Sequence, residues 1–142
     1  MSPGVVSAGY SGTPLVHKLG IKPEARLGLI GAPDGFDDTL GELPPGVHVR
    51  RRLSGQPFDV IVAFFVRRGA LERRLAALRG ALDPAGGLWL AWPKRASGVV
   101  SDLTDNVVRE LGLAAGLVDN KVCAVDQVWS GLRLVYRLRD RP

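Results

Sequence analysis

The sequence has little cysteine and no long hydrophobic run, and each absence excludes a class of protein. Cys123 is the only cysteine among 142 residues, so an intramolecular disulfide framework is excluded. No apolar run approaches the roughly 18 residues that a membrane-spanning helix needs. Residues 1–11 have neither the cationic start nor the apolar core of a signal peptide. We therefore expect a cytoplasmic protein that does not associate with a membrane.

The composition is that of one globular domain. Hydrophobic residues make up 46% of the chain and charged residues 23%, whereas a disordered chain is poorer in apolar residues. The length suits a single folding unit. We expect a flexible segment over residues 1–12, where Gly, Ser and Pro are frequent, and one α/β domain over residues 13–142.

The net charge of +5 comes mainly from arginine, since only 4 of the 19 basic residues are lysines. A basic domain can bind nucleic acid through a clustered patch. Here the arginines are spread along the chain, with short runs at residues 50–52, 67–68 and 73–74. We interpret them as a solvated surface, and keep nucleic-acid or protein-partner binding as an alternative.

The first third of the domain predicts short elements. Residues 14–19 read as a helix with Thr13 as its N-cap and Gly20 at its end. Residues 26–30 form a buried strand that ends in the turn chemistry of residues 31–35. A short helix over residues 36–43 and a short strand over 47–49, beside the first strand, follow.

The centre predicts a βαβ unit. Residues 58–65 are a continuous apolar strand, as in a parallel sheet that is covered on both faces. The next leucines have helical spacing, and a turn over residues 83–87 leads to a second buried strand over 88–92. The spaced residues are Leu71, Leu75, Leu78 and Leu82.

The last third adds a helix and an antiparallel hairpin. The helical stripe of Leu103, Val107, Val108 and Leu111 ends at Gly112 or Gly116. Strands over residues 121–126 and 132–137 flank a turn over 127–131, with Trp129 at its tip. The fold class is α/β: a three-layer Rossmann-like sandwich whose sheet is mostly parallel and has an antiparallel C-terminal hairpin.

From residue 58 onward the order of elements resembles the second half of an S-adenosylmethionine-dependent methyltransferase, as a truncated form of that fold. The family shares a strand that opens with Phe-Asp, a Leu-rich helix, a Pro-x-Gly-Gly turn and a terminal hairpin. Its cofactor determinants are missing. The strand that contains Gly28 and leads into Gly31 and Gly35 holds no acidic residue, and the strand that should end in a ribose-binding acid runs into three arginines. We therefore predict no cofactor and do not expect S-adenosylmethionine binding.

A second resemblance covers about residues 9–136. The segments 9–15, 18–23, 92–104 and 116–132 are similar to the signatures of a bacterial family, typical of actinobacteria, known as domain of unknown function 3052. That resemblance implies a single cytoplasmic α/β domain with no assigned activity. It implies no catalytic residues.

The candidate site lies at the carboxyl ends of the strands, where ligands bind in open α/β sheets. Lys94, Arg95 and Ser97 could hold a phosphate or carboxylate. Asp34 and Asp126 could accept from the donors of a polar ligand, and Trp92 or Trp129 could stack on it. The alternative is that these are loop residues that only cap the sheet. For Trp129 we expect packing back onto the sheet rather than a stacking surface for a ligand, because Trp is largely buried on average.

Three other kinds of side chain give weaker evidence for a functional site. Cys123, in an apolar strand, reads as a small buried hydrophobe, and Asp102 and Asp105 as complements to the dipole of the helix that follows. His17 and His48 stand on different elements with no ligand cluster nearby, so no metal is predicted.

Our leading hypothesis is a non-catalytic or ligand-sensing domain that binds a small anionic ligand. A minimal transferase or hydrolase derived from the methyltransferase fold is the alternative, and the sequence predicts no oligomeric state.

Overall fold

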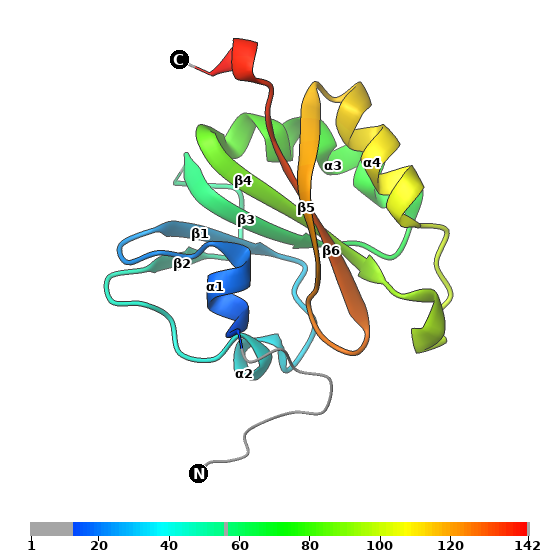
Figure 1. The fold of residues 1–142 in the computed structure, drawn as a ribbon, viewed down its shortest axis with the longest axis horizontal. Coiled ribbons are helices and arrows are strands. Elements are labelled where there is room, and N and C mark those ends of the chain that lie inside the picture. The colour runs from blue at the N-terminus through cyan, green and yellow to red at the C-terminus, as the bar shows by residue number, and fades with distance from the viewer. Residues whose placement is uncertain (1–12, 56, 142) are drawn as a thin grey trace.

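The computed structural model describes residues 13–55 and 57–141, which form one six-stranded sheet with helices on both faces (Figure 1). The expected flexible segment, residues 1–12, lies outside the described residues. The elements in chain order are α1 (Leu15–Leu19), β1 (Arg26–Ile30), α2 (Phe36–Leu40), β2 (His48–Arg50), β3 (Phe58–Phe64), α3 (Arg68–Ala81), β4 (Leu82–Pro93), the 3-10 helix η1 (Arg95–Ser97), α4 (Asp105–Ala114), β5 (Leu117–Ala124), β6 (Trp129–Tyr136) and η2 (Leu138–Asp140).

The sheet has the strand order β2-β1-β3-β4-β6-β5. The pairs β1–β2, β1–β3 and β3–β4 are parallel, and β4–β6 and β5–β6 are antiparallel. The mostly parallel sheet with an antiparallel hairpin is thus confirmed. Since the last strand inserts between β4 and β5, β5 and not β6 forms the open edge of the sheet.

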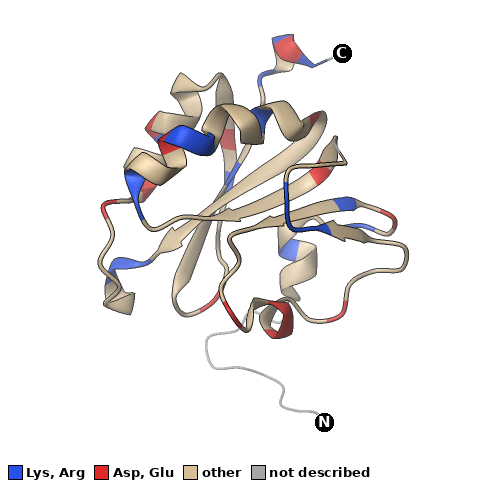
Figure 2. Ribbon diagram, turned by 180° about the vertical axis from the view of Figure 1, so that it is seen from behind, with Lys and Arg blue, Asp and Glu red and all other residues tan. Residues whose placement is uncertain are grey.

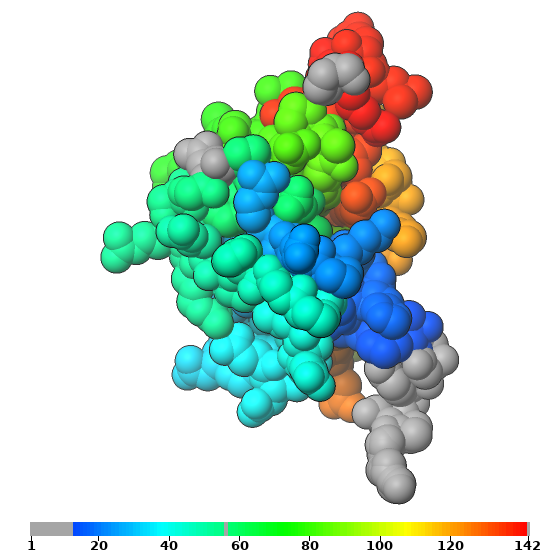
Figure 3. Space-filling view, turned by 90° about the vertical axis from the view of Figure 1, so that its left-hand side faces the viewer, coloured from blue at the N-terminus to red at the C-terminus, as the bar shows by residue number. Residues whose placement is uncertain are grey.

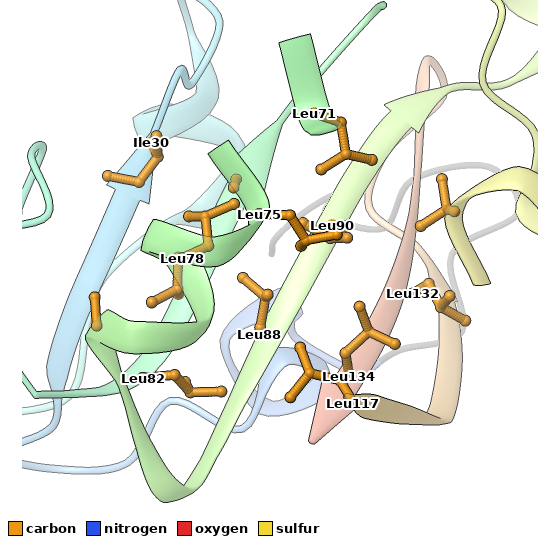
Figure 4. Packing of buried hydrophobic residues seen from close by; sticks show 14 of the residues in the cluster. Ile30, Leu71, Leu75, Leu78, Leu82, Leu88, Leu90, Leu117, Leu132 and Leu134 are labelled. Carbon is orange, nitrogen blue, oxygen red and sulfur yellow. The ribbon is translucent and has the colours of Figure 1, made fainter. Parts of the chain in front are cut away.

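Two hydrophobic cores lie on opposite faces of this sheet. Behind it in Figure 1, α3 and α4 cover a leucine-rich core to which β3, β4 and β6 contribute alternate side chains, as the close view in Figure 4 shows. In front, α1 and α2 cover a second core that is centred on Trp89. The Trp89 indole is fully buried and donates to the Leu19 carbonyl oxygen over 3.0 Å, which fixes α1 to β4.

The strands are close to their predicted positions, whereas several boundaries were wrong. Residue 14, rather than Thr13, is the N-cap of α1, because the ψ of Pro14, 145°, is extended. The second helix stops at Leu40, where Gly41 takes a φ of 80°. Gly112 lies inside α4 and packs against Leu134, and Gly116, at a φ of 89°, follows the helix.

The junction between α3 and β4 also differs from the prediction. Residues 83–87 were expected to be a turn, but β4 begins at Leu82 because Leu82 pairs with Phe58. A register shift between Phe58 and Val60 absorbs the irregularity, and the ladder resumes at Gly87. Residues 83–86 have no partner in this ladder, and the Ala85 backbone N–H donates to the Asp83 carboxylate over 2.8 Å, so the expected turn is an irregularity within β4.

Trp129 is not at the tip of the hairpin. It is the first residue of β6 and pairs with Pro93, and the loop is residues 125–128. The turn is shorter than predicted because the Asp126 carboxylate accepts from the backbone N–H groups of Val128 and Trp129, both over 2.8 Å. That local capping lets the second strand begin three residues earlier than expected.

The β2 edge of the sheet carries the arginine run. In Figure 3, atoms of the segment from α2 through β2, cyan to green, form much of this face. Arg51 pairs there with Asp37 of α2 over 3.0 Å. Of the helices behind the sheet, α3 carries four arginines and a single acid, Glu72, whereas α4 carries residues of both signs (Figure 2).

Candidate functional site

Close contacts connect the residues that follow β1, β3 and β4 to neighbouring segments at the carboxyl edge of the sheet. Gly31, which follows β1, lies so close to the Phe64 carbonyl oxygen that a Cβ would be 3.1 Å from it. The Ser101 hydroxyl donates to the Val66 carbonyl oxygen over 2.6 Å. The Lys94 backbone N–H donates to the Val128 carbonyl oxygen over 2.7 Å, which joins the end of β4 to the hairpin.

The N-terminus of α3 already has an anionic partner. The Asp102 carboxylate accepts from the Arg68 backbone N–H over 2.7 Å, across 34 residues of sequence. Helix N-termini favour negative charge, so this carboxylate takes the place that an anionic ligand would occupy. The prediction assigned Asp102 to α4; instead Thr104 caps α4, and its hydroxyl accepts from the Val107 backbone N–H.

Three aromatic rings fill the space beyond the ends of β1 and β3. Phe36 meets Phe64 edge-on at 4.8 Å between ring centroids, and Phe64 meets Trp129 in the same way at 5.1 Å. Phe36 is only 2% exposed. Trp129 packs back onto the sheet, so its ring belongs to the core of the α1 face.

A cavity of about 1150 Å³ opens beside this aromatic cluster, between α1, α2 and the β5–β6 hairpin. Its apolar walls come from both helices, the loop after α2 and the hairpin. The charged or ionisable residues that line it are His17, Lys18, Asp38, Glu42, Lys94 and Asp126. Its volume exceeds the roughly 300–1,000 Å³ that is typical of small-molecule sites.

The structure brings two of the six predicted site residues to the cavity and leaves four outside its lining. Lys94 and Asp126 line it. The Ser97 hydroxyl is used locally, since it donates to the Lys94 carbonyl oxygen over 2.7 Å. Asp34 and Arg95 are exposed, and Trp129 lies in the aromatic cluster.

The two predicted site residues that line the cavity, Lys94 and Asp126, differ in the hydrogen bonds and ion pairs that they already make. One oxygen of the Asp126 carboxylate is bonded to the hairpin backbone, so that side chain has a structural role whatever else it does. The half-buried Lys94 ammonium has no carboxylate within ion-pair distance among residues 13–55 and 57–141. It is the cation of the cavity that is free to meet a ligand.

Sequence reasoning missed the acidic wall of the cavity, Asp38 and Glu42. Asp38 lies within α2 and Glu42 follows it by two residues, and nothing in their spacing marks them as part of a site. They reach the cavity because α2 packs beside α1. This contact between two five-residue helices cannot be predicted from the sequence pattern of either helix.

A second, smaller hollow of about 410 Å³ lies between α3 and α4 on the other face. At its end the Arg79 guanidinium lies over the Tyr136 ring, 4.5 Å from the centroid. The Tyr136 hydroxyl in turn donates to the Arg79 carbonyl oxygen over 2.9 Å. These contacts fix the end of β6 to α3.

No cluster of three or more His, Cys, Asp or Glu side chains that could hold a metal ion occurs in the described part of the chain. Over the same residues, no helix is long and apolar enough to cross a membrane. Cys123 is half-buried, and burial raises the pKa of its thiol, an effect that nearby Lys18 and Lys121 partly oppose.

No family model matches the chain, and no curated protein matches it. The fold does match solved structures. A SAM-dependent methyltransferase from Aquifex aeolicus superposes with a TM-score of 0.61 at 15% identity, over 84% of this chain and 86% of that one. A didemethyltoxoflavin methyltransferase from Burkholderia thailandensis gives 0.57 at 18% identity, over 84% and 73%.

Magnesium protoporphyrin IX methyltransferase from Synechocystis PCC 6803, with bound SAM, gives a TM-score of 0.55 at 9% identity, over 87% of this chain and 74% of that one. The chain therefore has the fold of SAM-dependent methyltransferases. At these identities the likeness establishes the architecture alone, because one fold carries many functions.

Proposed function

We propose that this protein is a non-catalytic, ligand-binding domain built on the methyltransferase fold, and that it takes a small anionic molecule into the cavity between α1, α2 and the hairpin. The observation that carries the proposal is the cavity itself, with the unpaired Lys94 in its wall. An ammonium in a partly desolvated wall gains most from a phosphate or carboxylate, because both accept charge-assisted hydrogen bonds.

The residues at the cofactor position of the fold do not fit S-adenosylmethionine. In doubly wound sheets the ribose hydroxyls donate to an acidic residue at the end of the second strand. The end of β2 presents Arg50, Arg51 and Arg52, whose guanidiniums only donate. The Asp37 carboxylate nearby is bonded to Arg51.

Isothermal titration and thermal shift, with nucleotides, phosphorylated metabolites and dicarboxylates as probes, test the proposal on the full chain. Lys94→Met and Arg95→Met are matched variants, since the two cations are neighbours and only Lys94 lines the cavity. We expect at least one probe to bind the wild type and Arg95→Met, with affinity lowered by about tenfold in Lys94→Met. Equal loss in both variants, or no binding by any probe, would refute it.

The alternative is an enzyme derived from the methyltransferase fold, and the fold match together with the cavity volume favours it. Micromolar binding of S-adenosylmethionine, or methyl transfer to any acceptor in a cell extract, would establish that alternative and reject the non-catalytic proposal.

We also propose, from the segments quoted above, that the chain belongs to the family of domain of unknown function 3052. A cytoplasmic location is part of the same proposal. Binding of nucleic acid through the arginines has less support, because Arg51 and Arg68 are already paired, with Asp37 and Glu72. Retention on a DNA column at low salt, lost at moderate salt, would favour it.

A further inference from the structure

A group of cations lies on the α1 side of the β5–β6 hairpin, and none of them is among the residues that line the cavity. Lys121 of β5 lies directly opposite Arg133 of β6 in the ladder, so both side chains are on one face, with Cβ atoms roughly 5 Å apart. Like charges in that position destabilise a sheet. This pair is therefore a cost to the fold unless an anion lies between the two side chains.

The position of the Arg133 guanidinium is set by a missing side chain. A Cβ at Gly87 would lie 2.6 Å from its Nη2 and 2.7 Å from its Cζ, so the guanidinium occupies the space over β4 that any other residue at position 87 would take. Trp89, opposite Arg133 in the ladder, is fully buried beneath α1. The fold thus holds the guanidinium at a defined place against the sheet.

No carboxylate of residues 13–55 or 57–141 neutralises this group. The nearest acid along β5, Asp119, is bonded to Arg109 over 3.0 Å, and the described ion pairs include none of Lys121, Arg133 and Arg141. Arg141 donates from its Nε to the Tyr136 carbonyl oxygen. Burial, and then the charge of Arg141, lower the pKa of Arg133.

We propose that Lys121, Arg133 and Arg141 form a second binding site, for the phosphate of a small phosphorylated ligand. Three cations come together there from β5, β6 and the C-terminal segment, and no described ion pair gives any of them a carboxylate partner. A phosphate accepts bidentate hydrogen bonds from guanidinium groups and would relieve the repulsion between Lys121 and Arg133.

Titration calorimetry of the full chain with inorganic pyrophosphate, at constant ionic strength, tests this site. The variants are Arg133→Gln and, as a matched control, Arg139→Gln, an exposed arginine of η2 that is outside the group. We expect saturable binding to the wild type and the control, and an affinity weaker by about tenfold or more in Arg133→Gln. Circular dichroism checks that each variant is folded.

The Lys94→Met variant separates this site from the cavity. If it binds pyrophosphate as the wild type does, while Arg133→Gln does not, the second site stands independently of the proposed function. Loss of binding in Lys94→Met with retention in Arg133→Gln would overturn the second site and place the anion in the cavity. Absence of saturable binding to the wild type would overturn it as well.

Discussion

At the scale of single residues, Gly86 shows how a missing methyl group positions a strand. A Cβ on it would lie 2.6 Å from the Asp59 carbonyl oxygen, a backbone atom that cannot move aside. We expect Gly86→Ala to lower the free energy of unfolding by about 2 kcal/mol, as overpacking does. Gly80→Ala, on α3 with nothing within 4 Å of the new methyl, should instead raise it by about 0.5–1 kcal/mol.

Urea denaturation of the two glycine variants measures both effects. A Gly86→Ala protein as stable as the wild type would show that β3 and β4 adjust to the methyl group, and that the close approach seen here is not a constraint.

The Cys123 thiol gives a prediction about pH. Because its pKa is raised in the folded state, less thiolate is present at a given pH than in the unfolded chain. We expect a disulfide reagent at pH 8 to modify the native protein more slowly than the protein in urea. The same shift makes stability constant below the thiol's unfolded pKa and decreasing as the pH rises through the folded value.

Lys121→Gln extends the thiol experiment, because the Lys121 charge lowers the thiol pKa. The variant should react still more slowly than the wild type. A native reaction as fast as that in urea would contradict the raised pKa of this half-buried thiol.

At the scale of elements, α3 depends on a residue that is far away in sequence. Asp102→Ala removes the acceptor for the Arg68 backbone N–H and should cost about 1 kcal/mol, the usual effect of losing an N-cap. Asp102→Asn keeps an oxygen acceptor and should cost less. Asp105→Ala, in the first turn of α4, is the control and should cost a few tenths of a kcal/mol, roughly the dipole contribution alone. Equal losses in Asp102→Ala and Asp105→Ala, measured by thermal unfolding, would contradict the role of the cap.

The same element shows where sequence reasoning succeeds and where it stops. The strands over residues 26–30 and 58–64 were predictable because each is a continuous apolar run between turn residues, and three leucines of α3 have the spacing of one buried face. The start of β4 could not be predicted from the sequence, because it depends on the pairing of Leu82 with Phe58.

Some residues of the candidate site were likewise predictable from the sequence and others were not. Lys94 could be placed at the carboxyl edge because it follows a clear strand. The packing of Trp129 onto the sheet was predicted from the burial that Trp usually has, and its contact with Phe64 confirms it. The role of Asp102 was not predictable, because it depends on a contact with α3 that no local pattern encodes.

At the scale of the whole molecule, one hydrogen bond connects α1 to the sheet and so holds one wall of the cavity. Trp89→Phe removes the donor to the buried Leu19 carbonyl oxygen, which should lower the free energy of unfolding by about 1–3 kcal/mol. We expect faster hydrogen exchange in α1 than in α3, where no such contact is lost. Uniformly faster exchange across both helices would indicate a global loss of stability instead.

The insertion of β6 between β4 and β5 bears on how the chain folds as it is made. Synthesis runs from the N-terminus, and domains tend to fold in that order. β5 pairs only with β6 in the described sheet, so it has no strand neighbour until residues 129–136 have left the ribosome. Until then β4, which carries Leu88 and Leu90, stands as a bare hydrophobic edge. A ribosome that pauses late in translation would leave that edge open to pairing with another chain. The strand order therefore makes aggregation of the nascent chain the main hazard in the folding of this protein.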